Sequence, residues 1–145
     1  MAKEARGIRN NNPLNIRHNG DLFQGEIRPG TDKLFKQFSS PAYGYRAAFI
    51  TLGTYWSRGW NTIEKIVGHW APPNENNTEG YIEKVEKWSQ VKRDKVLTAN
   101  DGDAYIAIVM AMSLVENGVS CDMREVRAGF ALQNKLKSKL LSDGN

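Results

Sequence analysis

The chain has 145 residues, of which 40% are hydrophobic and 25% are charged. This length and composition suit one folded domain over residues 1–145 with a single core, and they exclude an intrinsically disordered protein. The formal net charge of +4 is a mild excess that suits an anionic polymer. Because Lys and Arg are spread evenly along the chain, we do not expect nucleic acid as the partner.

Cysteine content and hydropathy indicate the compartment in which the protein is made. Cys121 is the single cysteine, so no internal disulfide is expected. The first residues carry no apolar stretch of the signal-peptide type, and the longest apolar run is shorter than the roughly 20 residues that span a bilayer. We therefore expect synthesis in the cytoplasm without membrane insertion, and a separate delivery route if the target lies outside the cytoplasm.

The N-terminal part, residues 5–40, is rich in Asn, Gly and Arg, and its apolar residues occur singly or in short groups. Asn-Gly at 19–20 and Pro-Gly at 29–30 are strong turn signals. This pattern predicts an extended loop followed by a small β-hairpin or meander, with sides at about 22–28 and 34–38.

The remainder of the chain predicts five helices. Ser40 and Pro41 begin the first, Asn61 caps the second, Asn77 or Thr78 starts the third, and Asp103 caps the fourth. A capping box of Asp122 and Glu125 begins the fifth. The expected spans are 41–58 for the first helix, 62–69 for the second, 103–117 for the fourth and 123–134 for the fifth. The third starts at about 78 and includes Trp88, and a frayed polar tail covers 135–145. The fold class is mainly α, of the α+β type, with a small N-terminal β element.

The fourth helix, 103–117, is apolar on almost every side, so it should run through the middle of the domain. Gly118 is placed to close it, which puts Glu116 in its last turn at the rim of the core. Burial and the negative end of the helix dipole both raise the pKa of a carboxyl group there. Such a group suits general acid catalysis, and the alternative is an idle, solvated surface glutamate.

Two further segments carry candidate binding residues. Arg9–Arg17 holds four asparagines, whose amides suit sugar hydroxyl and acetamido groups, although Asx turns in a polar loop are the alternative. The segment 70–78 contains two prolines and has Trp60, Trp70 and Tyr81 nearby, so it can form a wall for stacked sugar rings or simply connect two helices. From these segments we take as substrate-binding candidates Asn12, Asn15, Arg17, Trp70 and Tyr81.

Metal and cofactor chemistry find little support in the sequence. His18 and His69 are the only histidines and neither has a ligand-like neighbour. Cys121 has no evident histidine partner, and nucleotide-binding and serine-hydrolase motifs are absent. We therefore expect no metal site and no cofactor.

Several segments resemble the lysozyme-like superfamily, particularly its bacterial and phage N-acetylglucosaminidase and lytic transglycosylase branches. Met112–Gly118 is similar to the helix that ends in a Glu-Ser-Gly-like motif, with Asn117 in the Ser position. The Asn-rich segment is similar to an Asn-Asn-Leu-Phe-Gly-Ile-Lys-like motif, with Asn15 in the Gly position. Phe35–Gly44 is similar to the aromatic-x-x-aromatic segment that follows the β-lobe. The glutamate helix precedes the Asn motif in those families and follows it here, which a circular permutation would explain.

The resemblance implies a lysozyme-like fold and a peptidoglycan glycan strand as substrate, with Glu116 protonating the glycosidic oxygen. A second carboxylate would be Glu26, or else Asp21 or Asp32, whereas lytic transglycosylases manage with one carboxyl group. Glu4 is the rival acid if the chain is not permuted.

The whole chain also resembles phage and prophage proteins that carry an Arg-Gly-Ile-Arg-Asn-Asn-Asn-Pro start and a Trp-Ala-Pro motif. These are described as virion-associated structural proteins or muralytic proteins. Because no signal peptide is visible, we expect delivery through a holin-type partner or within a phage particle. The alternative to an enzyme is therefore a non-catalytic virion or cell-wall-binding module on the same fold. A basic nucleic-acid-binding protein is a third, less favoured hypothesis.

Overall fold

The computed structural model describes residues 4–137, and it is mainly α-helical, as the sequence predicts. Helices α2 to α6 correspond to the five predicted helices, and a short α1 precedes them. Their bounds are α1 Arg6–Arg9, α2 Pro41–Ser57, α3 Ile63–Trp70, α4 Thr78–Ser89, α5 Gly102–Asn117 and α6 Met123–Ala131.

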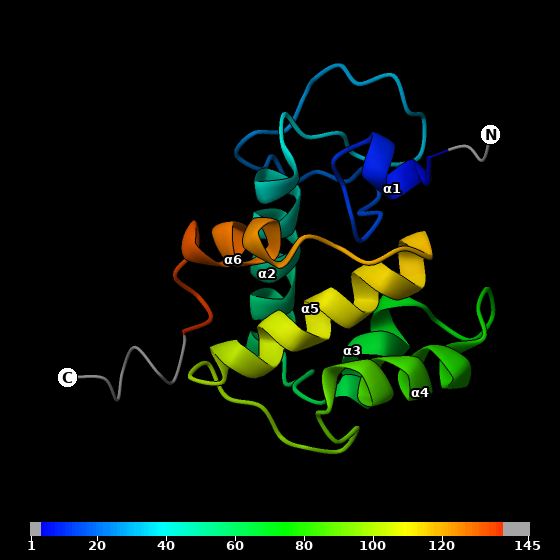
Figure 1. Cartoon of the computed structure of the whole chain (residues 1–145), viewed down its shortest axis with the longest axis vertical. Coiled ribbons are helices and arrows are strands. Elements are labelled where there is room, and N and C mark those ends of the chain that lie inside the picture. The colour runs from blue at the N-terminus through cyan, green and yellow to red at the C-terminus, as the bar shows by residue number, and fades with distance from the viewer. Residues whose placement is uncertain (1–3, 138–145) are drawn as a thin grey trace.

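Helix α5 runs through the middle of the molecule, with the other helices around it (Figure 1). Helices α3 and α4 lie on one side of α5, and α2 with α6 lies on the other. Its side chains Ile106, Ile108, Val109 and Met112 are all buried. The position between two helical layers explains why α5 is apolar almost all round, as the sequence indicates.

The α2–α6 contact is close because glycine lines it. A Cβ atom on Gly129 of α6 would lie 2.5 Å from the Cβ of Tyr45 on α2, so only glycine permits this approach. Phe49 and Phe130 meet edge to face beside it, with ring centroids 5.1 Å apart. This pairing fixes α2, whose outer face becomes important for the candidate site.

Three helix starts follow capping residues, with two shifts from the prediction. The side chains of Asn77 and Asp122 accept hydrogen bonds from backbone N–H groups of α4 and α6, but Thr62, rather than Asn61, does so for α3. Helix α5 begins after Asp101, not Asp103, and Gly118 closes it in the left-handed conformation at φ 71°. Just before this earlier start, the Thr98 N–H donates to the Asp101 carboxylate and closes a turn.

The predicted N-terminal β-hairpin does not form. Within the described residues this region is loop, with only two isolated bridges, between Arg17 and Phe35 and between Glu26 and Phe38. Polar side chains supply the hydrogen bonds that a strand ladder would otherwise provide. The buried amide of Asn12 donates to the carbonyls of Ile16 and Lys36 and accepts from the N–H of Ile16.

The predicted end of the last helix and the start of the predicted frayed tail are both wrong. Helix α6 ends at Ala131 rather than at 134, and residues 135–137 are packed rather than frayed. Leu136 is buried in the core, and the Lys137 backbone exchanges hydrogen bonds with Ala99 and Gly102. The rest of the predicted tail, 138–145, lies outside the described residues.

Two further features bear on the sequence predictions. Among residues 4–137, no helix combines the length and apolar character that crossing a bilayer requires. The two ends of this described segment lie on opposite sides of the molecule (Figure 1). Circular permutation is favoured when the ends of a domain lie close together, and the two ends of this segment do not.

Candidate functional site

Glu116 is half-buried at the end of α5, where two side chains from distant segments bind its carboxyl group. The Asn15 side-chain amide donates to Oε1 at 2.8 Å, and the Tyr81 hydroxyl donates to Oε2 at 2.9 Å. Asn15 comes from the N-terminal loop and Tyr81 from the first turn of α4. The structure thus brings together three of the residues that the sequence proposed for the site.

The surroundings of Glu116 favour its protonated form. Burial raises the pKa of its carboxyl group, and the hydrogen bonds from Asn15 and Tyr81 oppose that rise without cancelling it. Burial, together with the Glu116 charge, also raises the pKa of Tyr81 well above its usual value, so this phenol stays a neutral donor. A carboxyl group with a raised pKa, held by two fixed partners, has the properties of a general acid.

The loop reaches Glu116 because its backbone folds back on itself. Asn15 has φ 54°, in the left-handed region that asparagine tolerates better than most residues. The side-chain amide of Asn117 donates to the carbonyl of Pro13 at 2.8 Å, which ties the end of α5 to the same loop. Gly7 of α1 packs against these amides, with no room for a Cβ atom beside Asn117 and Asn15.

Asn12 has a structural position rather than an exposed one. It is 0% exposed and its amide is bonded to the loop backbone, so it shapes the loop that carries Asn15 and does not face a ligand. This position does not favour direct contact with a ligand, and substrate binding by Asn12 stays a prediction. Its side chain acts on the site through the backbone conformation of its neighbours.

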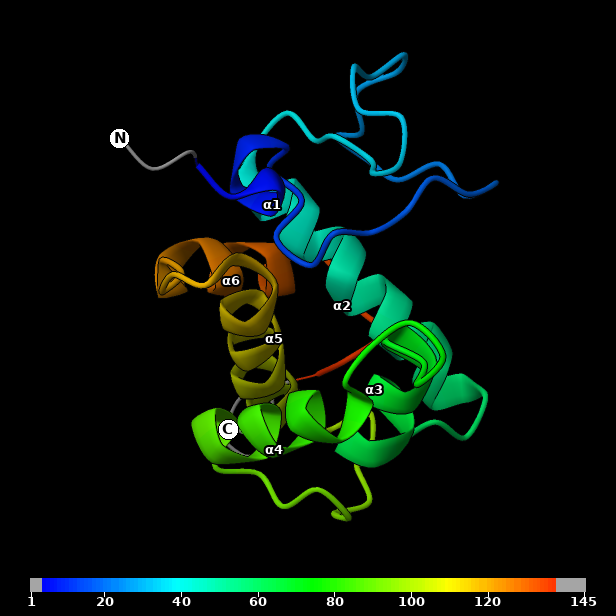
Figure 2. The same ribbon diagram turned by 90° about the vertical axis from the view of Figure 1, so that its right-hand side faces the viewer.

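A groove of about 950 Å³ lies beside the Glu116 cluster, within the size range of ligand sites. Asn15 and Arg17 line it on the loop side, and Trp70 lines it at the end of α3. Tyr81 is buried and, like Glu116, does not line the groove. Asn15, which lines the groove and hydrogen-bonds to Glu116, connects the two. Figure 2 shows the loop, α2 and α3, the elements that supply these walls.

Sequence reasoning missed the wall of the groove that α2 and Lys135 supply. Groove-lining side chains recur every four residues along this helix at Arg46, Ile50 and Thr54, and Arg58, the residue after the helix, continues the spacing. This spacing places them on one face. The polar residues at this spacing are a sequence signal for a solvent-facing side of α2. The sequence prediction used only the apolar face of the same helix.

Glu26, the predicted second carboxylate, is held in an ion pair of the N-terminal loop. Its side chain is 1% exposed and binds the fully buried Lys36 at 3.1 Å and Arg28 at 3.0 Å. Burial raises the pKa of Glu26, but the hydrogen bonds from Arg28 and Lys36 outweigh it and leave the pKa below its usual value. This environment favours a charged, structural carboxylate, and a catalytic role for Glu26 stays a prediction.

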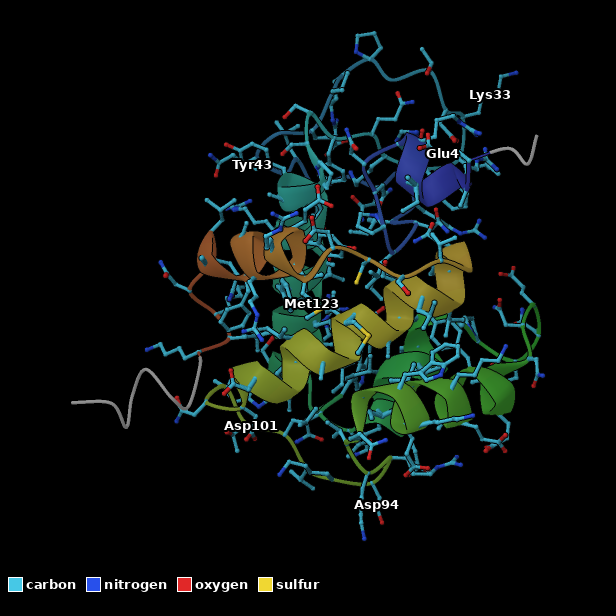
Figure 3. The ribbon with its side chains drawn as sticks, in the orientation of Figure 1. Glu4, Lys33, Tyr43, Asp94, Asp101 and Met123 are labelled. Atoms are coloured by element: carbon cyan, nitrogen blue, oxygen red, sulfur yellow. The ribbon has the colours of Figure 1, made fainter. Side chains whose placement is uncertain are left out.

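The other candidate carboxylates are placed differently. Asp32 accepts hydrogen bonds from Arg6 and Asn10, which hold its pKa well below the usual range. Asp21 lines the groove and is exposed. Glu4 lies beside α1 at the outer edge of the molecule (Figure 3) and is also exposed. Of these acids, only Asp21 borders the groove.

The described residues contain no cluster of three or more His, Cys, Asp or Glu side chains able to hold a metal ion. His18 lines the groove, whereas His69 stacks on Trp60 with ring centroids 3.5 Å apart. Cys121 is half-buried.

Comparison with known proteins places the chain among phage proteins. No protein-family model matches it. Over 131 residues it is 40% identical to protein P5 of Pseudoalteromonas phage PM2, an alignment that covers 87% of this chain and 80% of that protein. The chain belongs to the same family as this phage protein. The phage association that the sequence indicated is thus confirmed.

We predict that Tyr81→Phe raises the pKa of Glu116 further, because one of the two hydrogen bonds that lower it is lost. The folded-state pKa already lies above the unfolded-state value of about 4.3, so Glu116 destabilises the folded state increasingly as pH rises between these two values. The variant should widen this interval. Carbon-13 NMR titration of the glutamate carboxyl carbons measures the shift.

Tyr43→Phe is the matched control, because Tyr43 is not a partner of Glu116 and lies at a separate part of the molecule (Figure 3). It should leave the titration unchanged. An unchanged or lowered pKa of Glu116 in Tyr81→Phe would contradict the geometry described here.

We predict that Glu26→Gln destabilises the fold by about 3–5 kcal/mol, because it leaves the buried Lys36 ammonium without its anion. Adding Lys36→Met to Glu26→Gln should recover most of this loss. Urea denaturation of the single and double variants measures both effects. Wild-type stability of Glu26→Gln alone would show that the pair does not hold the loop.

Proposed function

We propose that this phage-related protein cleaves the glycan strand of peptidoglycan, with Glu116 as the general acid. The observation that carries the proposal is the half-buried Glu116 carboxyl group with a raised pKa, held between Asn15 and Tyr81 beside a groove. In the reaction, Glu116 donates its proton to the glycosidic oxygen as the bond to the anomeric carbon breaks.

Asn15 and Tyr81 act as positioning residues in this proposal. Their hydrogen bonds fix the two carboxyl oxygens, so the proton of Glu116 is offered in a defined direction. Both partners are neutral donors. A cationic partner would instead stabilise the ionised form of Glu116 and lower its pKa. The resemblance of the Glu116 and Asn15 segments to lysozyme-like motifs supports the same assignment.

The spatial arrangement supports the lysozyme-like hypothesis in one further respect. The Glu-containing and Asn-containing motifs lie about a hundred residues apart in the sequence, yet their side chains are hydrogen-bonded. Their reversed order is therefore compatible with a shared site. After the glycosidic bond breaks, the anomeric carbon is attacked either by water, which completes hydrolysis, or by a hydroxyl group of the same sugar, which gives an anhydro product. The group that activates this nucleophile determines which product forms.

A second candidate function is a non-catalytic module of the phage particle or a module that binds the cell wall. The relationship to a phage protein supports this candidate as much as an enzyme, since a fold does not fix a function. Delivery within a phage particle, or through a holin partner, suits either candidate. A measurement of peptidoglycan turnover distinguishes the enzyme from the non-catalytic module.

We predict that the wild-type protein clears suspensions of purified peptidoglycan and that Glu116→Gln lowers the rate by about 10²–10⁴-fold, the range typical of general acid catalysis. Mass spectrometry of the released fragments identifies the bond that is cut. Circular dichroism checks that each variant keeps its helices. Peptidoglycan from several wall types guards against a narrow substrate range.

The matched control is Asp94→Asn, which removes an exposed carboxylate in the loop between α4 and α5 (Figure 3). It should keep the wild-type rate. Equal rates for wild type and Glu116→Gln would remove Glu116 as the acid. A folded wild-type protein without turnover on any wall type would favour the non-catalytic candidate.

A further inference from the structure

The groove beside Glu116 has a wall with several cationic side chains. Arg46 lies on α2 and Arg58 is the residue that follows its C-terminal end, so at 1.5 Å rise per residue they are about 18 Å apart along the helix direction. Lys135 lines the groove on the same side and bonds to Thr54, which lies between them on α2. We call Arg46, Arg58 and Lys135 the cationic stripe.

Each member of the cationic stripe is held in place while keeping donors free. Arg46 Nε donates to the carbonyl of Leu132 at 3.2 Å, and Lys135 Nζ donates to Thr54 Oγ1 at 3.2 Å. The Arg58 guanidinium lies 5.4 Å from the centre of the Trp60 ring. None of the ion pairs in the described part of the chain involves these three residues.

The attachment of Lys135 is built into the fold rather than left to a loose tail. Its Cβ would lie 2.9 Å from a Cβ on Gly53 of α2, so glycine at 53 permits this close approach. Buried Leu136 and the bonded backbone of Lys137 hold the segment that follows. The ammonium group is therefore presented along α2.

The opposite side of the groove carries Arg17 and His18, and its carboxylate is Asp21. Four Lys or Arg side chains thus face one carboxylate across the lining, which gives the groove a positive potential. Tyr55 and Trp70 lie between the charges, with ring centroids 6.1 Å apart, and supply apolar surface. Such a lining matches a ligand that has both flat apolar faces and several anions.

We propose that the cationic stripe makes this groove selective for a glycan strand that bears carboxylates over a neutral one. The strand lies along α2, with its carboxylates on Arg46, Arg58 and Lys135 and sugar faces on Tyr55 and Trp70. The proposal rests on the proposed function for the position of the strand beside Glu116. It adds the residues that determine which strand binds.

The test measures binding rather than cleavage, so that it stands apart from catalysis. Full-length Glu116→Gln is titrated with soluble peptidoglycan strands that carry peptide stems and with a neutral N-acetylglucosamine oligomer of similar length. We expect Arg46→Gln with Arg58→Gln in this background to weaken binding of the peptidoglycan strand roughly tenfold or more, since charge-assisted bonds are lost. Binding of the neutral oligomer should change less than about twofold.

The matched control removes the same charge elsewhere. Arg124→Gln with Arg127→Gln, on α6 and outside the groove lining, should leave both affinities unchanged. If the Arg46 variant is not folded by circular dichroism, Arg58→Gln with Lys135→Gln replaces it and should give the same selective loss.

Three outcomes would overturn the proposal. Equal weakening for charged and neutral strands would make the stripe a general contact. No weakening for either strand would remove it from the site. Tighter binding to duplex DNA than to peptidoglycan strands, lost in the same variant, would assign the stripe to nucleic acid. Selective weakening without any turnover in the wild type would support the stripe while removing the enzymatic function.

Discussion

The hydrogen bond from Asn15 to Glu116 is the contact on which the site depends, because it joins segments 101 residues apart. It needs a helix that ends at the rim of the core, which Gly118 provides, and a loop residue in the left-handed region, which Asn15 provides. A second bond, from the Asn117 amide to the Pro13 carbonyl, holds the same two segments together. The groove exists where this loop, α2 and the end of α3 meet.

Glu26 and Glu116 are both withdrawn from solvent, but their pKa values shift in opposite directions. Glu26 meets the cations Lys36 and Arg28, which stabilise its charge and lower its pKa. Glu116 meets the neutral donors Asn15 and Tyr81, which do not offset the effect of burial on its pKa. Environment rather than residue type therefore separates a structural anion from a candidate acid.

The sequence predicted the helices well because their apolar spacing and end residues are local signals. It also predicted Glu116 at the end of a central helix, and Asn15 and Tyr81 near it. It did not predict that Asn12 would be buried, that Lys36 would pair with Glu26, or that residues 135–137 would pack. These outcomes depend on contacts between distant segments, which no local pattern records. The β-hairpin failed for the same reason, since turn signals mark where a chain reverses but not whether strands pair.

The most direct test of the account is a crystal structure of Glu116→Gln with a peptidoglycan glycan fragment bound. We expect a glycosidic oxygen within hydrogen-bonding distance of the side chain at position 116, with the strand in the groove along α2. A fragment bound elsewhere, with the residue 116 side chain out of reach of any glycosidic oxygen, would contradict it.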